Sequence, residues 1–468
     1  MKRLLLIVLV TLLIAACSAP GSNENSVISG KWSRKSAGKI CLYVLNNGEL
    51  SEIASSMLSK DSAFYFALKP QEGRFYFIGT ADKAITSKYA FYFKPGDKEL
   101  NLAVTADSYI LTGGNSEENK ELTKWHDFVQ PLEWISFYHN ESFILTDSTP
   151  RHSTYVDFFP LLEEKIKAAN DYPKSATANK EFNRAFEEYK KFNILNIATY
   201  FTATPRPAHP ELSDYPDYYR NIDIAGLTKT AAILDYSPLG IAPIEKAIFQ
   251  KLLLDKKEYS NPIDAILEEL PSIVNDTLKG ELVSKFVSTK RTFAGLLDYE
   301  EKYGKYLVTD TQKEKLRVLK NTLNVLKEGA PAIDFKFPDA NGKQVALSDF
   351  KGKLVYIDVW ATWCGPCKQE IPHLKKLEEE YRSKDIVFLS VSVDKTKDHA
   401  KWKEFLVKEE LKGVQIFGGD DAQKYVIQSY KISGIPRFIL VGRDGNIISI
   451  DAPRPSSSEI RPLLKANS

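Results

Sequence analysis

Lys353-Leu-Val-Tyr-Ile-Asp-Val359, followed closely by Trp363-Cys364-Gly365-Pro366-Cys367, decides the fold of the C-terminal part of this chain. The first stretch is a nearly continuous apolar run, which is typical of a β-strand covered on both faces. After the second cysteine, apolar residues recur every three or four positions, which predicts a helix over 366–381 with one apolar face. The two cysteines are therefore expected where a buried strand passes into a helix.

The rest of the C-terminal region alternates strand and helix patterns. A Gly-Ala-Pro sequence at 329–331 ends the preceding helix. Further elements are expected as a buried strand at 385–393, helices at 397–408, 421–430 and 457–464, a short strand at 414–417, and a hairpin of 437–442 with 446–451. These patterns predict an α/β fold with a mixed sheet for residues 329–468.

Cys364 and Cys367 are candidates for a redox-active dithiol. At the start of a helix, unpaired backbone N–H groups and the helix dipole favour a thiolate at Cys364. Cys367 follows three residues later, close enough to form a disulfide with it. A zinc site would need two more ligands, and no second Cys pair or Cys/His pair is present. A c-type haem site would need His at 368, where the chain has Lys. The pattern indicates thiol-disulfide exchange without a metal or other cofactor.

Residues 329–468 resemble the thioredoxin superfamily and, within it, envelope proteins of the TlpA and ResA type. The resemblance rests on Ala361–Cys367 followed by Glu370-Ile371-Pro372, and it covers roughly the last 30% of the chain. It implies a thioredoxin-like fold and thiol-disulfide oxidoreductase activity on protein clients. The Gly-Pro pair between the cysteines is similar to that of reducing members, which favours a reductase.

The resemblance also implies a substrate-binding surface around the dithiol. Gly434-Ile435-Pro436 matches the family's cis-proline loop, in which the backbone of Ile435 pairs with an extended substrate peptide and Pro436 faces the dithiol. Trp363, Gly365 and Pro366 complete this predicted surface.

Two acidic residues are further candidates for catalysis. Asp358 lies within the apolar strand, where burial should raise the pKa of its carboxyl. In thioredoxins an acid at this place helps to move the proton of the second cysteine, so we expect Asp358 to act on Cys367. Glu370 matches an acid that the ResA subgroup keeps near its dithiol, or else it is a solvated helix residue.

The N-terminus has the build of a bacterial lipoprotein signal. A short basic head precedes thirteen apolar or near-apolar residues at 4–16, whereas a membrane-spanning helix needs roughly 20. Ile14-Ala-Ala-Cys17 resembles a lipobox, in which the cysteine is lipidated and becomes the mature N-terminus; the alternative is ordinary cleavage nearby. We expect a signal peptide over 1–16, a tether over 17–26, and a bilayer anchor at Cys17 that holds the protein in the cell envelope, facing the periplasm.

Charge and cysteine content narrow the function further. Without its signal peptide the chain has 61 basic and 61 acidic residues, so a basic face for nucleic acid is not expected. Cys41 lies in an apolar, strand-like run at 40–44. It is expected to be a buried structural thiol, the alternative being a redox partner.

The N-terminal two thirds of the chain show no catalytic pattern. Residues 27–117 read as short aromatic and β-branched strands, which predict an antiparallel sandwich or barrel. They resemble the β-rich domain of unknown function that precedes thioredoxin modules in envelope lipoproteins. Residues 118–328 are predicted to be helical, with the best helices at 158–169, 180–201, 244–254 and 311–326. Four prolines at 204–219 predict a surface loop, whose tyrosines are expected to pack rather than to bind a ligand.

These expectations combine into a multidomain α+β envelope lipoprotein that reduces protein disulfides. Its electrons would come from an upstream thiol donor in the membrane. The alternative is a client-binding or assembly lipoprotein whose dithiol senses or locks a partner without turning over. A peroxidase is not favoured, because no cysteine lies in a threonine-containing loop suited to peroxide.

Overall fold

The computed structural model describes residues 26–33, 38–81, 88–105, 108–137, 154–174, 176–206, 208–382 and 385–468. The chain forms two compact units, Met1–Ser272 and Ile273–Ser468. The predicted helical region at 118–328 is therefore divided between them. Among the described residues, no helix is both long enough and apolar enough to cross a membrane.

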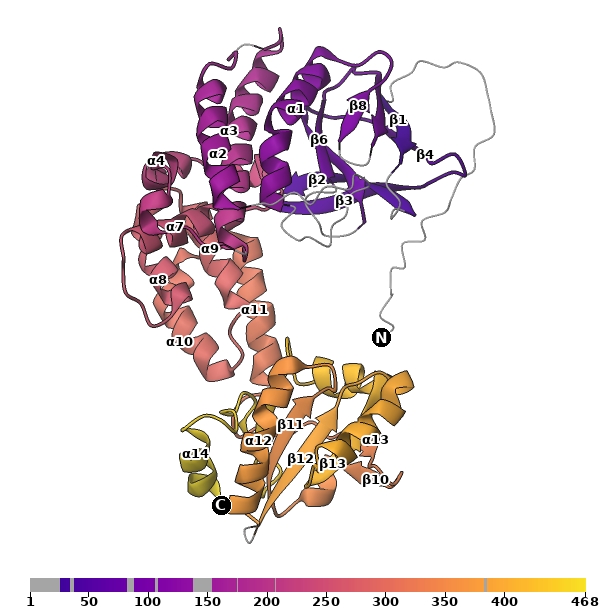
Figure 1. Cartoon of the computed structure of the whole chain (residues 1–468), viewed down its shortest axis with the longest axis vertical. Coiled ribbons are helices and arrows are strands. Elements are labelled where there is room, and N and C mark those ends of the chain that lie inside the picture. The colour runs from indigo at the N-terminus through magenta and orange to yellow at the C-terminus, as the bar shows by residue number, and fades with distance from the viewer. Residues whose placement is uncertain are drawn as a thin grey trace, which may run out of the picture. The chain divides into compact units, whose positions relative to one another are not determined.

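The first unit begins with a β-sandwich (Figure 1). One sheet has the order β4-β1-β7-β8 and the other β3-β2-β5-β6. The strands are β1 (Ser26–Trp32), β2 (Lys39–Asn46), β3 (Glu49–Met57), β4 (Ala63–Leu68), β5 (Arg74–Thr80), β6 (Lys88–Phe93), β7 (Glu99–Val104) and β8 (Tyr109–Leu111). Apolar side chains of both sheets form one core, which confirms a sandwich. The pairing of β1 with β7 is parallel, whereas the sequence predicted antiparallel strands throughout.

Helices make up the rest of the first unit, and some of them cover the outer face of the second sheet. They are α1 (Glu117–Phe137), α2 (Tyr155–Asn170), α3 (Lys180–Ala203), α4 (Asp217–Arg220), α5 (Ile224–Leu227), α6 (Ile233–Tyr236), α7 (Ala242–Leu254) and α8 (Pro262–Glu268). Cys41 and Phe75 on the strands share a core with Trp125 of α1 and Phe182 of α3. The strands β2, β5 and β6 are thus buried on both faces, because they are apolar on both sides, whereas the edge strand β3 is polar and largely exposed.

The predicted loop at 204–219 is more ordered than its prolines suggest. It leads into α4, and Tyr219 is buried with its hydroxyl donating to the Ala198 carbonyl oxygen at 2.9 Å. Tyr215 and Tyr219 join the same core as the helices, so packing accounts for these tyrosines, as expected.

The second unit starts with three helices, α9 (Asp276–Val287), α10 (Phe293–Tyr303) and α11 (Asp310–Asn324). The α/β domain that follows has a five-stranded sheet of order β13-β12-β11-β14-β15. Its elements are the hairpin β9 (Lys336–Pro338) and β10 (Gln344–Ala346), then β11 (Leu354–Trp360), α12 (Gly365–Glu380), β12 (Ile386–Ser392), α13 (His399–Lys408), β13 (Val414–Phe417), β14 (Arg437–Val441), β15 (Ile447–Ser449) and α14 (Ile460–Asn467).

The sheet is mixed, as predicted. β11 pairs in parallel with β12 and antiparallel with β14. Tyr356 of β11 packs with Leu377 of α12 and Leu464 of α14, while Trp402 of α13 packs near the cysteines. The predicted helix at 421–430 is instead a π-helix over Gln423–Gln428. This architecture confirms the predicted fold class: an N-terminal β domain, a helical middle region and a C-terminal thioredoxin-like domain.

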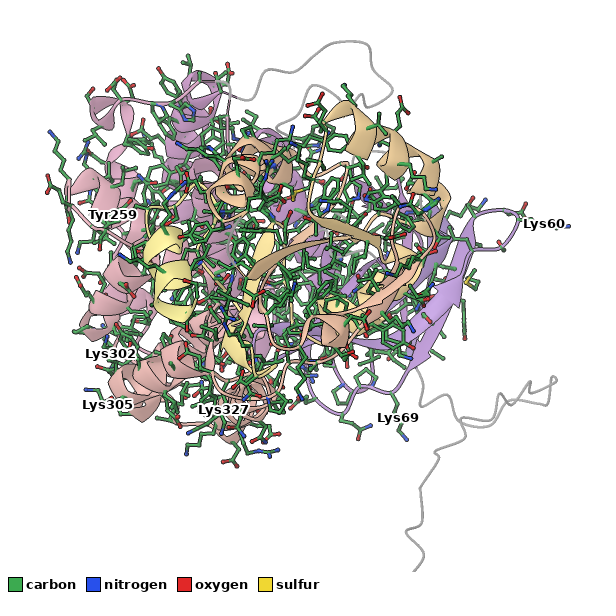
Figure 2. All side chains as sticks on the ribbon, turned by 90° about the horizontal axis from the view of Figure 1, so that it is seen from below. Lys60, Lys69, Tyr259, Lys302, Lys305 and Lys327 are labelled. Atoms are coloured by element: carbon green, nitrogen blue, oxygen red, sulfur yellow. A yellow bond between two sulfur atoms is a disulfide. The ribbon has the colours of Figure 1, made fainter. Side chains whose placement is uncertain are left out.

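Several lysines lie on the outside of both units. Figure 2 shows Lys60, Lys69, Lys302, Lys305 and Lys327 extending outward, and each of them is exposed. Lys302 also forms an ion pair with Asp298 one helical turn away, at 3.0 Å.

Candidate active site

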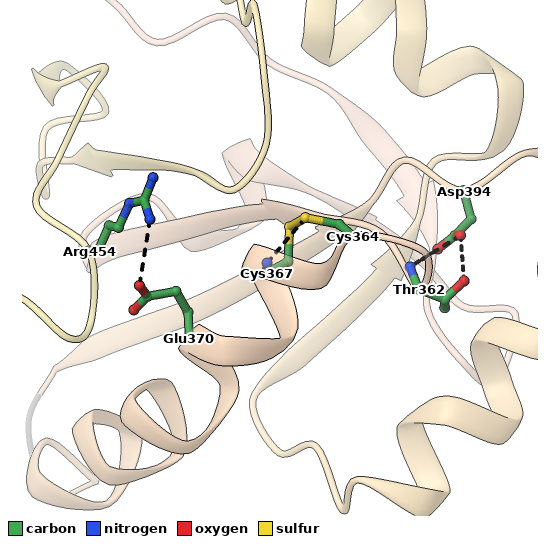
Figure 3. Close-up of a disulfide and its surroundings, with 6 residues drawn as sticks. All are labelled: Thr362, Cys364, Cys367, Glu370, Asp394 and Arg454. Carbon is green, nitrogen blue, oxygen red and sulfur yellow. Dashed lines mark hydrogen bonds and ion pairs between the residues drawn. A yellow bond between two sulfur atoms is a disulfide. The ribbon is translucent and has the colours of Figure 1, made fainter. Parts of the chain in front are cut away.

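The two cysteines lie at the junction of β11 and α12, where the sequence predicted them. Cys364 is the N-cap residue of α12, and its Sγ accepts a hydrogen bond from the Cys367 N–H at 3.1 Å. The pair forms a disulfide (Figure 3). An N–H donor and the positive end of the helix dipole at Cys364 stabilise a thiolate there. Each cysteine is 4% exposed in this oxidised state, so burial alone does not distinguish them.

The surface beside the disulfide is open on the side of the predicted substrate-binding residues. Trp363 is 62% exposed, and Gly365 and Pro366 are exposed as well. The Ile435–Pro436 peptide bond is cis, as the family resemblance implied. Ile435 packs against the cluster that contains both cysteines. A partner can therefore reach this edge of the dithiol without unfolding the domain.

Asp358 lies on the buried side of the dithiol, in the middle of β11. It stands opposite Ser390 of β12 and Phe438 of β14, and only 9% of its surface is exposed. Burial raises the pKa of this carboxyl to about 8, and the negative charges of Glu378 and Glu370 add to the effect. Asp358 and Cys367 line one small cavity, so the carboxyl and the second cysteine share a compartment.

Glu378 also lines this cavity, and the sequence interpretation missed it. It stands seven residues after Ile371 and four after Leu374, on the apolar side of α12, and this unusual place for a carboxylate was the available signal. Burial raises the pKa of Glu378 to about 7, against the opposing effect of Lys375 and Lys412. The sequence alone could not show that this face meets Asp358.

Asp394 is a second residue that the sequence interpretation missed. Its fully buried carboxylate accepts hydrogen bonds from the Thr362 N–H at 2.9 Å, the Thr362 hydroxyl at 2.7 Å and the Ser392 hydroxyl at 2.8 Å. Figure 3 shows the Thr362–Asp394 pair beside the turn that carries Cys364. Because charge-assisted hydrogen bonds are short and strong, Asp394 holds the backbone two residues before the attacking cysteine.

Glu370 is buried, which rules out the solvated-helix alternative. Its carboxylate accepts from the Ser456 N–H at 3.0 Å and the Ser456 hydroxyl at 2.9 Å, and it lies 3.9 Å from the Arg454 guanidinium. In the view of Figure 3 it faces Arg454 and not the sulfurs. These contacts join α12 to the segment before α14. The negative charge of Glu370 also raises the pKa of Asp358.

The remaining candidate residues lie away from this site. Cys41 is a free, fully buried thiol in β2, as expected for a structural residue. Cys17 lies outside the described residues. Across the described ranges, no group of three or more His, Cys, Asp or Glu side chains is arranged to hold a metal ion.

Known proteins match the part of the chain that holds this dithiol. A family model described as Redoxin matches residues 327–463. The thiol-disulfide oxidoreductase ResA of Bacillus subtilis is 31% identical over 141 residues, which are 30% of this chain and 75% of that protein. ResA of Bacillus cereus is 32% identical over 138 residues, covering 29% and 76% of the two chains.

The chain belongs to the ResA-type thiol-disulfide oxidoreductases. A crystal structure of the thioredoxin domain of a thiol-disulfide oxidoreductase from Bacteroides vulgatus is 30% identical, covers 30% of this chain and 98% of the other, and gives a TM-score of 0.28. The relatives named ResA and the Redoxin match identify this chain as a thiol-disulfide oxidoreductase, and the matched part is the C-terminal α/β domain.

Proposed function

We propose that this oxidoreductase is a reductase of protein disulfides in the cell envelope. The observation that carries the proposal is the two-sided environment of the dithiol. One side has the helix N-terminus and the exposed Trp363, whereas the other side has the buried carboxyl of Asp358 in one cavity with Cys367. The first side suits attack on a partner and the second suits release of the product.

In the proposed reaction, the Cys364 thiolate attacks one sulfur of a client disulfide. A Cys364–client disulfide forms, the client disulfide breaks, and the departing client thiolate takes a proton from solvent. Cys367 then gives its proton to Asp358 and attacks the Cys364 sulfur. The Cys364–Cys367 disulfide forms, the Cys364–client disulfide breaks, and the second client sulfur leaves as a thiolate that takes a proton from solvent. Two electrons pass from the dithiol to the client.

Client binding is proposed to use the open edge of the site. An extended peptide would lie along the backbone of Ile435 beside Pro436 and contact the exposed indole of Trp363. Main-chain pairing of this kind tolerates many sequences, because it reads the backbone rather than the side chains. Trp363, Gly365 and Pro366 would then contact the residues next to the client disulfide.

A further part of the proposal concerns how the Cys364–Cys367 disulfide is reduced again after each cycle and where the protein is located. Each cycle leaves Cys364 and Cys367 oxidised to a disulfide, so a thiol donor, which we place in the membrane, must reduce this disulfide again. A lipid on Cys17 would keep the protein beside that donor, facing the periplasm. Labelled palmitate should enter the wild type but not Cys17→Ser, and equal labelling of both would contradict the anchor.

Turnover of a disulfide substrate tests the proposed activity. With dithiothreitol as donor, catalytic amounts of the full chain should reduce many equivalents of insulin, and Cys364→Ser should not. A client-binding or assembly protein would consume about one equivalent and then stop. That stoichiometric result would overturn the reductase in favour of a sensor or lock.

A further inference from the structure

The cavity behind the dithiol holds two carboxyls rather than one. It is lined by Asp358 of β11 and by Cys367, Lys375 and Glu378 of α12, together with Trp360 and Gln415. Its free volume for the centre of a water molecule is about 10 Å³. This is close to the minimum for one ordered water.

The polar lining of the cavity suits such a water. The Trp360 indole N–H and the Gln415 side-chain oxygen are buried and have no hydrogen-bond partner within the described part of the chain. Buried polar groups of this kind are usually paired with protein atoms or water. A water in the cavity would find a donor and an acceptor there besides the two carboxyls.

Glu378 also borders the solvent. It lines an open groove, together with Glu379 of α12, Arg382 just after the helix, and Lys412 and Gly413 from the turn before β13. A methyl group added at Gly413 would meet Glu378 Oε1 at 2.8 Å, which places the carboxylate against that turn. Asp358 does not line this groove, whereas Glu378 and Lys375 line both the groove and the cavity. Glu378 is therefore the carboxyl that stands between the cavity and the outside.

The charges around the pair come from a few elements. On α12, Glu370 and Glu378 act on Asp358, and Lys375 acts on Glu378. The turn before β13 supplies Lys412. Where β12, β13 and β14 adjoin the pair, they supply the uncharged Ser390, Gln415 and Phe438. Two carboxyls in one low-dielectric compartment oppose each other's ionisation, so they titrate as a pair.

We propose that Glu378 and Asp358 hold one proton between them and serve Cys367 as a single proton site that opens to solvent through Glu378. This inference rests on the proposed reductase cycle and adds a tuning residue to it. The thiol proton of Cys367 passes to the pair, the resulting thiolate attacks Cys364, and the proton leaves through Glu378 into the groove. Glu378 acts through Asp358, and its charge sets the pH range in which Asp358 accepts the proton.

Two substitutions with opposite effects on charge test this inference. In Glu378→Gln the negative charge beside Asp358 is gone, so the acid limb of the pH profile for mixed-disulfide decay should move to lower pH by roughly half to one unit. Decay should become several-fold faster near pH 6 and slower on the alkaline plateau, because Asp358 becomes a weaker base. Lys375→Met removes a positive charge and should move the same limb to higher pH.

Glu380→Gln is the matched control. Glu380 lies two residues after Glu378 on α12; it is exposed, paired with Arg461, and absent from both the cavity and the groove. The acid limb of the pH profile for mixed-disulfide decay in this control should coincide with that of the wild type. Decay of a preformed mixed disulfide with a thiol peptide should be followed by quenched mass spectrometry from pH 5 to 9.

The outcomes separate the inference from the proposed function. If wild-type protein does not turn over insulin, the reductase itself fails. If the wild type turns over but Glu378→Gln keeps the wild-type limb, or slows decay equally at every pH, the shared proton is wrong and the reductase stands. A direct titration of the Asp358 carboxyl by carbon NMR in folded, oxidised Glu378→Gln guards against a folding defect, since an unchanged Asp358 pKa would also overturn the inference.

Discussion

Cys41 in the first unit and the Cys364–Cys367 pair in the second are both buried, yet they lie in opposite chemical settings. Cys41 stands in the middle of β2, is fully buried, and has a thiol pKa raised mainly by that burial. Cys364 has a helix N-terminus, a backbone N–H donor and an exposed tryptophan beside it. The comparison teaches that a reactive thiol here depends on the helix terminus and an open edge, not on burial.

Two carboxyls with a raised pKa show the same contrast between the units. Glu133 of α1 has a pKa raised to about 7 by burial, with the Asn193 amide 3.4 Å from its carboxylate and His126 at 3.8 Å. No cysteine is among the described residues that line its cavity. The pKa of Asp358 is raised further, to about 8, and Asp358 shares its cavity with Cys367. A raised pKa becomes useful for this chemistry only where a thiol can deliver its proton.

The largest expected effect separates the two kinds of cysteine. Cys364→Ser should reduce insulin turnover to the background rate, because no thiolate remains at the start of α12. Cys41→Ala should keep turnover within about twofold of the wild type, with a stability loss of about 1–2 kcal/mol from the small cavity. If Cys41→Ala abolished turnover in a folded protein, Cys41 would be a redox partner and the comparison would fail.

The next effect separates the two carboxyls. Asp358→Asn should slow decay of the mixed disulfide roughly 10²–10⁴-fold near neutral pH, as expected for loss of a general base. The first attack by Cys364 should stay near the wild-type rate. Glu133→Gln removes another carboxyl whose pKa is raised, and should change neither step. Decay of Asp358→Asn at the wild-type rate would make Asp358 only a buried polar residue.

The pH dependence of stability sharpens this comparison. The folded-state pKa of Asp358 is about 8, above the ordinary value near 4 of an unfolded chain. Over this range the folded domain keeps a proton that the unfolded chain releases. Its free energy of unfolding therefore falls by about 1.4 kcal/mol per pH unit as pH rises from about 4 to 8. Asp358→Asn should remove this slope, so it should be the more stable protein at pH 8, with the gap closing towards pH 4.

Hydrogen exchange of β11 peptides along a urea series reports the stability of this domain alone. The measurement should be made on oxidised protein at pH 4, 6 and 8, with Glu133→Gln as the control from the other unit. Parallel stability curves for Asp358→Asn and the wild type would show that the carboxyl is ionised at neutral pH.

The smallest expected effect concerns Asp394, which holds the turn and does not touch the sulfurs. Asp394→Ala leaves the Thr362 N–H and hydroxyl without their carboxylate, which should cost about 2–3 kcal/mol of stability. The displaced turn should slow attack by Cys364 about tenfold. Asp421→Ala, at an exposed position, should change neither quantity. An unchanged attack rate in folded Asp394→Ala would remove Asp394 from the positioning of the dithiol.

Much of the C-terminal domain was predictable from sequence, for identifiable reasons. The apolar run before the cysteines and the helical spacing after them lie at β11 and α12, and the short strand at 414–417 matches β13. Each of these signals is local, because it depends on residues a few positions apart. The cis bond before Pro436 was predictable only from the family resemblance.

The features that escaped prediction depend on distant or hidden partners. Asp394 is 32 residues from Thr362, and the position of Glu378 against Asp358 requires the packed domain. Helix α1 lies in the region predicted to be helical but was not among the individual helices named there, because it contains Pro131 and buries polar residues such as Asn119, which obscure its apolar face. Asn119 accepts from and donates to the backbone of Tyr92, a pairing that no local pattern shows.

The most direct test of the account is to trap the mixed disulfide from each side of the dithiol. Full-length Cys367→Ala and Cys364→Ala should be mixed with a disulfide-linked peptide pair, quenched with acid, and analysed by intact-mass spectrometry. If Cys364 attacks and Cys367 resolves, we expect Cys367→Ala to accumulate a stable adduct on Cys364, whereas Cys364→Ala should form little or none. A prominent adduct on Cys367, with none on Cys364, would contradict the assignment of Cys364 as the attacking thiol and Cys367 as the one that resolves.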